Sequence, residues 1–588
     1  GYIEWELENL TEMLIPNTDK KDIKEDKDVR GHKIYNFYKK DNKPIIPGSS
    51  LRGVIRSVYE TITNSCLSTT NDESFLHRRY PDASKAGLII NDGGKIYLYD
   101  NDNENLTKVK LEAISNIKDL SRVDHLDNGK VKYNPKANNI IFRGNKGSSK
   151  KVAIFKRGKK VSELTEEQLN RLKYLLYLYE DSGESKGYRN YRHLLRKVLN
   201  GQEEMIPVYY KKGNNTYYLS PACITREVFE NTLNKLLELN GNYQPCTDVK
   251  SLCSACALFG TTNLEKNALT LAIGSRIRFT DAYVEKPNGD YFMEYMPLKE
   301  LSSPKISSVE FYMFKPDVKE KVDSFNYDYL FNWENNKNIV KNILKTDYLP
   351  RIRGRKYYWH HHNFKINLVK NNKKSKLNIS AELLKRGHTF TFKVYFDKVT
   401  KMELNQLLWA LDFDNPNIDA SSYFRHPRAH KIGMGKPLGL GSCIIRVKNI
   451  KVRDICIDNN KINYTIKDLK RNEIPKLEIK SMPLRELFEI ASFIDNKATD
   501  KMAMRRKDID VKYPYVELDF IKHSPNDDAG HQWFNENRGP QVKEKIKKTL
   551  PQVGFTDENN IQPLYLETYI RKQKNKSNKK NYNRKSQK

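Results

Sequence analysis

The sequence lacks any long apolar run. No stretch of its 588 residues approaches the roughly 20 apolar residues that span a bilayer, which argues against a membrane protein. No secretory signal opens the chain, and because residue 1 is glycine and not methionine, the natural N-terminus is expected to be trimmed or missing. Cysteine is scarce too, and seven residues, an odd number, do not suit a disulfide framework. We therefore expect a protein of the reducing cytoplasm.

Acidic residues are too few to balance the basic ones. The chain carries 73 Asp and Glu against 104 Lys and Arg, so its formal net charge is +31. This excess favours a polyanionic partner, because basic proteins gain affinity by displacing counterions from phosphates. The 35 tyrosines recur among the basic residues, which suits stacking on single-stranded bases. The alternative is a genome whose composition raises lysine everywhere.

The pattern of apolar residues predicts an α+β fold. Strand-like segments occur at 1–16, 34–37, 275–283, 390–396 and 443–447. Helices are expected over 50–65, after capping boxes at Thr165–Gln168 and Thr400–Glu403, and at the apolar positions of 484–491. A β-β-α order early and a β-α-loop-β order late resemble one ferredoxin-like (RRM-type) sheet that long insertions split.

This pattern divides the chain into three parts. The RRM-like domain is expected over 1–455, interrupted by insertions at about 85–215 and 285–385. A C-terminal extension over 456–570 follows. From 571 to 588 no acidic residue occurs, so this end is predicted to be a disordered basic tail.

The segment 44–57 places a short apolar strand, a Pro-Gly turn and a helix in succession. Ser49 or Ser50 is expected to cap this helix. Arg52 and Arg56 lie one turn apart beside its free backbone N–H groups, so the segment predicts a phosphate site. The alternative is an ordinary amphipathic helix with solvated arginines.

A loop with four glycines, 433–441, lies between the last helix and strand of the expected sheet. Glycine permits positive φ and a close approach of backbone N–H groups to a ligand, and Lys436 adds a point charge. The spacing is neither that of a Walker A loop nor that of a Rossmann fingerprint. The alternative is a plain turn.

A further basic segment, 351–362, interleaves cations with aromatic residues. Arg353, Arg355 and Lys356 lie beside tyrosines, a pattern that suits single-stranded RNA better than a duplex. A solvated basic strand is the alternative. The three histidines at 360–362 are not expected to bind a metal, because adjacent residues rarely point at one ion.

Three cysteines have a spacing typical of metal ligands. Cys246, Cys253 and Cys256 can supply three thiolates to a structural zinc ion. The alternative is three cysteines packed in the core. The spacing does not identify a fourth ligand, for which the candidates are Cys66, His77 and Cys223.

Four segments, in this order, resemble motifs of the RAMP superfamily of CRISPR-associated proteins. They are Ile-Pro-Gly-Ser-Ser-Leu-Arg-Gly (46–53), Cys-Ser-Ala-Cys-Ala-Leu-Phe-Gly (253–260), Ser-Arg-Ile-Arg-Phe-Thr-Asp-Ala (275–282) and the glycine loop (433–441). The likeness is to the backbone-type subunits of type III effector complexes, within a large and divergent subfamily. It covers about 11–64, 246–284 and 386–450.

The resemblance implies an RRM-like fold that grips the sugar–phosphate backbone of a CRISPR RNA, while the guide selects single-stranded target RNA by base pairing. It also implies other subunits of the complex as partners, and no membrane. The residues that match RNA-facing motifs are Ser49, Ser50, Arg52, Arg56, Gly435, Lys436 and Gly439. Arg276, Arg278, Arg353, Arg355 and Lys356 complete the candidate RNA-binding residues.

The resemblance is weaker for catalysis. Related subunits cleave target RNA with an aspartate before the Ile-Pro-Gly-Ser-Ser motif and a divalent cation such as Mg²⁺. Here His32 stands near that place, with Asp22, Asp26 and Asp28 just upstream in the charge-dense segment 17–30. One acid could position a 2′-hydroxyl or bind a metal, with His32 as base, or the segment is simply solvated.

Three functions therefore stay open. The first is an RNA-binding subunit that positions guide and target RNA. The second is a metal-dependent endoribonuclease that cuts target RNA or matures the guide. The third is an RNA-independent assembly protein whose insertions bind other subunits.

Overall fold

The structure is a computed structural model of the chain, and it describes residues 1–494 with gaps, together with 554–555 and 561–562. The gaps are 71–73, 80–83, 103–106, 111–116, 126–129, 143–150, 182–185, 213–215, 224–225, 263–271, 287–288, 302–311, 314–323, 326–328, 332–340, 343–350, 361–372, 420, 422–424 and 459–460. The expected basic tail, 571–588, lies outside the described residues. No helix within the described ranges is both long enough and apolar enough to cross a membrane.

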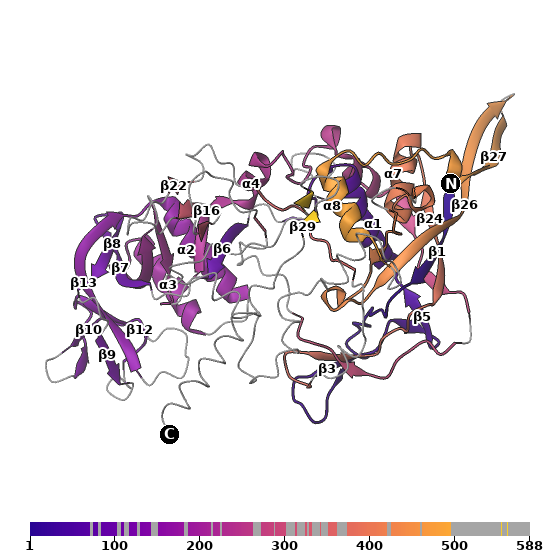
Figure 1. Cartoon of the computed structure of the whole chain (residues 1–588). Helices are drawn as coiled ribbons and strands as arrows, with labels where there is room; N and C mark the ends of the chain where they lie inside the picture. Colours follow the sequence, from indigo (N-terminus) through magenta and orange to yellow (C-terminus); the bar gives the residue numbers. More distant parts are fainter. Residues whose placement is uncertain are drawn as a thin grey trace, which may run out of the picture.

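The central sheet joins strands from distant parts of the chain (Figure 1). β1 (Tyr2–Asn9) lies between β26 (Ser442–Asp458) and β24 (Thr389–Phe396), and β24 also pairs with β17 (Ile277–Phe279) and β18 (Ala282–Val284). All these pairs are antiparallel. The sheet also includes β4 (Lys39–Lys40), β5 (Lys43–Ile46), β25 (His430–Lys431) and β27 (Lys461–Leu469).

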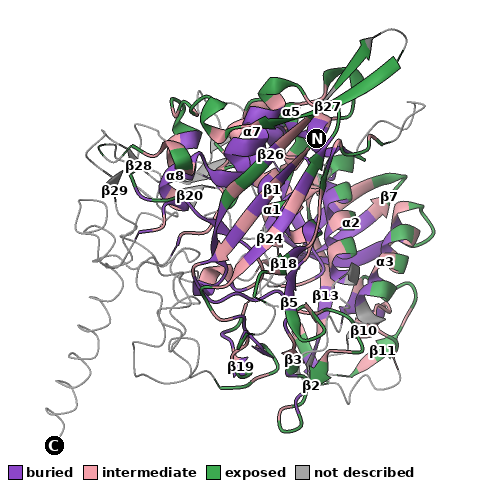
Figure 2. Ribbon diagram, turned by 90° about the vertical axis from the view of Figure 1, so that its right-hand side faces the viewer, coloured by how far each residue is buried: buried purple, intermediate pink, exposed green. Residues whose placement is uncertain are grey.

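One face of this sheet is covered by helices. Alternate residues of β1 are buried, because neighbouring side chains of a strand point to opposite faces. The apolar sides of α1 (Gly48–Ile62), α7 (Lys401–Asp412) and α8 (Met482–Ala491) share a core with these residues. The residues between these buried positions point to the opposite face of the sheet, here called the open face, and are less buried (Figure 2).

Helix α1 begins at Gly48, two residues earlier than expected, and no serine caps it. Its N-cap is Pro47, which makes no side-chain hydrogen bond to the helix. Instead, the Gly48 N–H donates to Oδ1 of Asp281 at 2.8 Å. The prediction that Ser49 or Ser50 caps the helix was wrong, because a carboxylate from a distant segment takes that place.

The chain between α1 and α4 forms a second body with its own core, here called the inserted domain (75–232). It begins at β6 (Phe75–Arg79) and ends at β16 (Arg226–Thr232), and these two strands pair antiparallel. Its main strands are β7 (Lys85–Asp92), β8 (Lys95–Asn101), β9 (Thr107–Lys110), β12 (Asn139–Phe142), β13 (Lys151–Glu163), β14 (Met205–Lys212) and β15 (Tyr217–Ser220). Helices α2 (Glu166–Asp181) and α3 (Lys186–Leu199) share its core.

Several local predictions are confirmed. The capping box of Thr165 and Gln168 is formed at the start of α2, and that of Thr400 and Glu403 at the start of α7. Helix α8 lies where the apolar positions predicted it. The last strand is longer than expected, because β26 continues to Asp458. The existence of α3 was missed.

The remaining elements are short. Around 17–37 a small sheet joins β2 (Lys24–Glu25), β3 (Lys33–Tyr35), β19 (Met296–Pro297) and β23 (Ile379–Ala381), with β3 and β23 parallel. The others are α4 (Leu233–Leu239), α5 (Ser254–Phe259), β10 (Val123–His125), β11 (Val131–Tyr133), β20 (Ser324–Phe325), β21 (Tyr329–Phe331), β22 (Lys341–Asn342), β28 (Gly554–Phe555), β29 (Ile561–Gln562) and 3-10 turns at Val249–Ser251, Asn415–Asn417, Lys436–Leu438 and Arg471–Glu473.

Candidate metal centre and nucleic-acid interface

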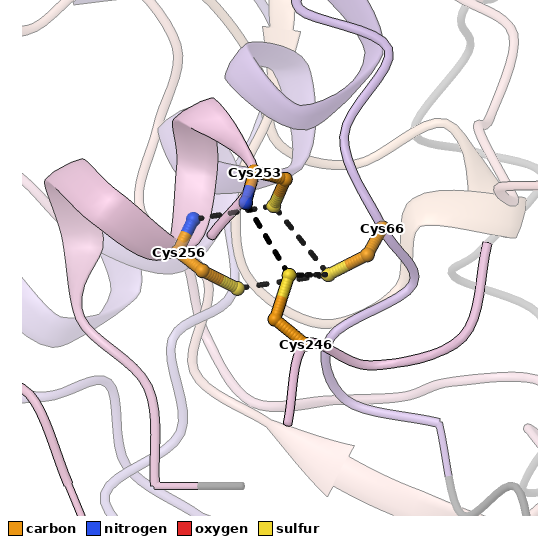
Figure 3. Close-up of side chains that lie close together, drawn as sticks. All are labelled: Cys66, Cys246, Cys253 and Cys256. Carbon is orange, nitrogen blue, oxygen red and sulfur yellow. Dashed lines mark hydrogen bonds between the residues drawn. The ribbon is translucent and has the colours of Figure 1, made fainter. Parts of the chain in front are cut away.

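Four cysteines meet between α1 and α5 and form the cysteine cluster: Cys66, Cys246, Cys253 and Cys256 (Figure 3). The Sγ atom of Cys66 lies 3.6 Å from those of Cys253 and Cys256 and 3.7 Å from that of Cys246. A tetrahedral zinc site with bonds of about 2.3 Å places its sulfurs about 3.8 Å apart. A disulfide would need about 2.05 Å. The cluster therefore has the dimensions of a four-thiolate metal site.

Local structure aims these sulfurs at one point. Cys253 is the N-cap of α5, and its Sγ accepts a hydrogen bond from the backbone N–H of Cys256. The Sγ of Cys246 accepts one from the N–H of Cys253 at 3.4 Å. The hydrogen bonds of its sulfur with the thiols of Cys256 and Cys66 lower the pKa of Cys253. Cys66 is thus the fourth member, and His77 and Cys223 are not part of the cluster.

Two of the arginines expected to contact RNA, Arg56 and Arg355, lie beside the cysteine cluster. Arg56 Nη2 is 3.8 Å from Cys256 Sγ, and Arg56 Nε donates to Glu60 at 2.9 Å. Arg355 Nη2 donates to the carbonyl oxygen of Cys66 at 2.8 Å, and its Nε donates to Glu60 at 3.3 Å. Both guanidinium groups therefore donate hydrogen bonds to backbone carbonyl groups near the cluster and place positive charge beside the sulfurs.

The beginning of α1 rests on two of the other motif segments. A Cβ atom on Gly48 would lie 2.6 Å from the carbonyl oxygen of Phe279, so only glycine fits there. Arg52 Nη2 donates to the carbonyl oxygen of Phe259 at 2.5 Å, and burial lowers the pKa of Arg52. Ser49 is exposed and Ser50 is half-buried. Three motif segments, 46–53, 253–260 and 275–282, thus pack on one another.

Arg276 and Arg278 have different surroundings although both lie in one motif. The Arg276 guanidinium pairs with Glu403 and donates to the carbonyl oxygen of Ala257 at 3.0 Å. Arg278 is exposed on β17, where it stands opposite Tyr395 on the open face. Of the two, Arg278 is the one available to a ligand.

The open face carries aromatic rings and cations that were not singled out from the sequence. Tyr283 is 54% exposed and Tyr395 is 43% exposed. The ring centroids of Tyr2 and Tyr395 are 5.9 Å apart, and Lys393 Nζ lies 5.0 Å from the Tyr2 ring centroid. Lys393 also pairs with Glu4 at 2.8 Å. The signal in the sequence was one tyrosine in each of three strands, at a position next to buried apolar residues.

The glycine loop packs against the chain that follows β1. All four glycines, Gly433, Gly435, Gly439 and Gly441, have positive φ. A Cβ on Gly441 would lie 2.0 Å from the carbonyl oxygen of Ile432. Because Gly435 and Gly439 are buried, close packing accounts for the glycines of this loop. Lys436 is half-buried, and burial lowers its pKa.

The beginning of α1 and the glycine loop lie at different levels along β1. The loop leads into β26 beside Asn9, at the end of β1. The beginning of α1 lies against Thr280, whose N–H donates to the carbonyl oxygen of Lys393, opposite Glu4. Five residues of β1 separate these levels, about 17 Å along the strand. Hydrogen bonds from Met434 to Leu14 and from Tyr38 to Ile15 also link the glycine loop to the strands that precede α1.

The acidic segment holds most of its candidate residues in structural contacts. The Asp26 carboxylate lies 2.8 Å from Lys374 Nζ, and this hydrogen bond lowers the pKa of Asp26. His32 is buried, and its ring nitrogens lie 2.8 Å from a backbone carbonyl oxygen and a serine hydroxyl. Asp22 accepts a hydrogen bond from Asn17, and only Asp28 of these four is fully exposed. In the part of the chain that the structure describes, the cysteine cluster is the only group of three or more His, Cys, Asp or Glu residues placed to hold a metal ion.

The segment 351–360 is partly built into the protein. Arg353 Nε donates to the carbonyl oxygen of Met313 at 3.1 Å, and burial lowers the pKa of Arg353 to about 10. Lys356 is exposed, with Nζ 5.0 Å from the Tyr358 ring centroid. His360 is buried, and both ring nitrogens are hydrogen-bonded within the protein. His361 and His362 lie outside the described residues.

Comparisons with known proteins return a family match for part of the chain. A model of the RAMP superfamily matches residues 6–202, and no curated protein matches the chain. Two solved structures are similar to it: "Type III-B Cmr-beta Cryo-EM structure of the Apo state" (10% identity, TM-score 0.18, covering 76% of this chain and 96% of that one) and "Cryo-EM structure of the Type III-B Cmr-beta bound to cognate target RNA" (12% identity, TM-score 0.17, 76% and 97%). TM-scores this low establish nothing by themselves. The match to the RAMP superfamily model over residues 6–202 agrees with the resemblance seen in the motifs of that part of the chain.

Proposed function

We propose that the chain is a CRISPR RNA-binding RAMP subunit of a type III ribonucleoprotein that positions guide and target RNA. The observation that carries the proposal is the family match over 6–202, which includes β1 and α1 of the central sheet. The strand order β26-β1-β24-β18, with α1 and α7 on one face, supports the ferredoxin-like sheet in this proposal. The inserted domain lies in the connection between α1 and β17, the next strand of this sheet along the chain.

The RNA surface in this proposal runs along the open face to the beginning of α1. Proteins with RRM-type sheets stack bases on aromatic residues of that face. Tyr2, Tyr283 and Tyr395 supply rings, and Lys393 and Arg278 supply positive charge for phosphates. Ser49, Ser50 and Arg52 extend this surface at one end. Gly435, Lys436 and Gly439 would meet RNA only at the other end of the sheet.

The test replaces exposed residues, because the half-buried Arg52 and Arg56 also donate hydrogen bonds to backbone carbonyl groups of the fold. A double variant, Ser49→Glu with Arg278→Glu, should lose the RNA that co-purifies with the wild-type chain, measured as the ratio of absorbance at 260 and 280 nm. The matched control is Lys173→Glu, an exposed position on α2 of the inserted domain. Wild-type RNA content in the double variant would refute this surface. Substituting Arg52 or Arg56 is less informative, since both bind backbone carbonyl groups near α5.

The wild-type chain itself separates the proposal from the assembly hypothesis. Expressed together with the proteins encoded beside it, the chain should carry RNA, and sequencing that RNA should return repeat-derived guides. An absorbance ratio typical of pure protein would favour an RNA-independent assembly role.

We also propose that the cysteine cluster holds one structural zinc ion. The sulfur separations, the backbone N–H groups directed at two of the sulfurs and the nearby Arg56 all support this. Four protein ligands leave no open position, so the ion would contribute stability and no chemistry. Cys66 precedes the inserted domain and Cys246 follows it, so the metal would join the two chain segments that connect this domain to the core.

A further inference from the structure

The hairpin of β26 and β27 extends beyond the central sheet. β26 pairs with β1 only as far as Lys451, opposite Tyr2. Residues 452–458 pair with β27 alone among the described strands. In both views the hairpin projects from the rest of the molecule (Figures 1 and 2).

One face of this projecting hairpin is apolar, and we call it the apolar face. The register sets Ile455 opposite Tyr464 and Ile457 opposite Ile462, and Ile466 lies beside them opposite Arg453. The five apolar residues are strongly exposed: Ile455 60%, Ile457 73%, Ile462 58%, Tyr464 54% and Ile466 66%. The alternate positions are different in character, with Cys456 opposite Asn463 and Val452 opposite Lys467. The hairpin is therefore amphipathic although both of its faces are exposed.

Such a surface is larger than a monomeric protein usually leaves in water. Together the five residues expose about 600 Å², mostly apolar, at the upper end of the largest patches seen on monomers. Covered by a partner of equal area, the face would bury about 1,200 Å² in total, which reaches the lower limit of specific interfaces. An isolated two-stranded hairpin is marginally stable in water, so a partner would also order this one.

The chemistry of the apolar face favours a protein over RNA. Isoleucine side chains neither bind phosphates nor provide a flat surface for bases. Tyr464 is the only ring on this face, and the Arg453 guanidinium already lies 4.3 Å from its centroid. The polyanion-binding groups of the proposed function lie on the sheet, not here.

The net charge of the chain argues against a second copy as the occupant. Two chains that each carry +31 repel one another, whereas a neutral or acidic partner does not. On the apolar face itself, exposed Arg453 adds one positive charge, whereas Lys461 and Lys467 lie on the opposite face of the hairpin. The complementary surface is therefore an apolar groove with an acidic residue at its rim.

We propose that the apolar face docks into an apolar, acid-rimmed groove of a different protein subunit. This inference rests on the proposed function, because that partner is sought among the subunits of the same ribonucleoprotein. The hairpin would thus be an assembly arm, and the open face of the sheet would stay free for RNA.

The test compares the two faces of the hairpin in the full chain. Ile457→Ser with Ile462→Ser removes apolar area from exposed positions, and Cys456→Ser with Asn463→Ser changes the opposite face. Each chain is titrated into the co-expressed complex that lacks it, and amide hydrogen exchange of 452–467 is measured free and assembled. The apolar-face variant should bind at least tenfold more weakly, with unchanged RNA content. The control should bind within twofold of wild type, and assembly should protect the hairpin from exchange.

Four results would overturn the inference. They are wild-type affinity in the apolar-face variant, an unprotected hairpin in the assembled complex, protection by guide RNA alone, and a wild-type dimer that the isoleucine substitutions abolish. Failure of the proposed function gives another pattern: the chain carries no RNA, yet the isoleucine substitutions still weaken its binding to a protein subunit. If the chain binds neither RNA nor a subunit, both proposals fail.

Discussion

Replacing Cys66 with serine should weaken the attachment of the inserted domain to the core. The link from Cys66 to Cys246 through a metal ion closes 180 residues of chain. In the chain-entropy treatment of cross-links, closing a loop of that length removes about 18 cal/mol/K from the unfolded state, which is about 5 kcal/mol at 25 °C. Loss of the ion should therefore cost several kcal/mol of stability.

The assay measures metal content and stability in parallel. The wild-type chain should hold about one zinc ion per molecule by elemental analysis, and Cys66→Ser should hold much less. Thermal unfolding of Cys66→Ser should begin at a lower temperature, and a strong chelator should shift the wild-type curve in the same direction. Cys223→Ser and Cys456→Ser are the matched controls, because neither residue belongs to the cysteine cluster.

Two results would refute this reasoning. The first is a wild-type chain that holds no zinc after growth with zinc and purification without chelators. The second is a Cys66→Ser variant that unfolds at the same temperature as the two controls. In either case the cluster would be a group of packed thiols, the alternative that the spacing left open.

Three further predictions concern stability. Gly48→Ala should lower the free energy of unfolding by about 1–3 kcal/mol, because the added Cβ would lie 2.6 Å from a backbone oxygen. Gly53→Ala should stabilise α1, because no atom lies within 4 Å of its added Cβ. The two free energies are measured by urea unfolding, and equal changes in both variants would show that the packing at Gly48 is unimportant. Asp412→Ala removes one of the two carboxylates that pair with the Arg471 guanidinium, while Asp414 remains at 2.7 Å. It should cost about 2 kcal/mol by the same assay, and a change below 1 kcal/mol would contradict the ion pair. Burial lowers the pKa of Lys431 to about 7, so the folded state binds fewer protons than the unfolded state above that pH; the free energy of unfolding should rise between about pH 7 and 10, and Lys431→Met should remove this rise. Identical pH slopes in both chains would show that Lys431 is not responsible.

Local signals in the sequence predicted local structure well. The capping boxes at Thr165 and Thr400 each involve a partner three residues away, so spacing alone identified them. The same holds for β24, whose alternation of buried and half-buried residues is a strand property. The spacing of Cys253 and Cys256 likewise identified two members of the cysteine cluster.

Contacts between distant segments could not be predicted in this way. Asp281 binds the first N–H of α1 across 233 residues, and no pattern near Gly48 announces it. Cys66 joins its partners across 180 residues or more, so its membership depends on how the inserted domain returns. The local pattern assigned Arg56 to RNA and gave no sign that it would lie beside the cysteine cluster and bind Glu60. The projecting hairpin, by contrast, had a visible signal: isoleucine at alternate positions on both sides of a short turn.

The pairing of β6 with β16 has a consequence for how this chain can vary. The two strands run side by side, so everything between them departs from the core and comes back at one location. A short turn could therefore bridge the gap if that whole body were removed, and the remaining strands could still pair as they do. The central sheet can in this way host accessory bodies of very different size without changing its own order of strands.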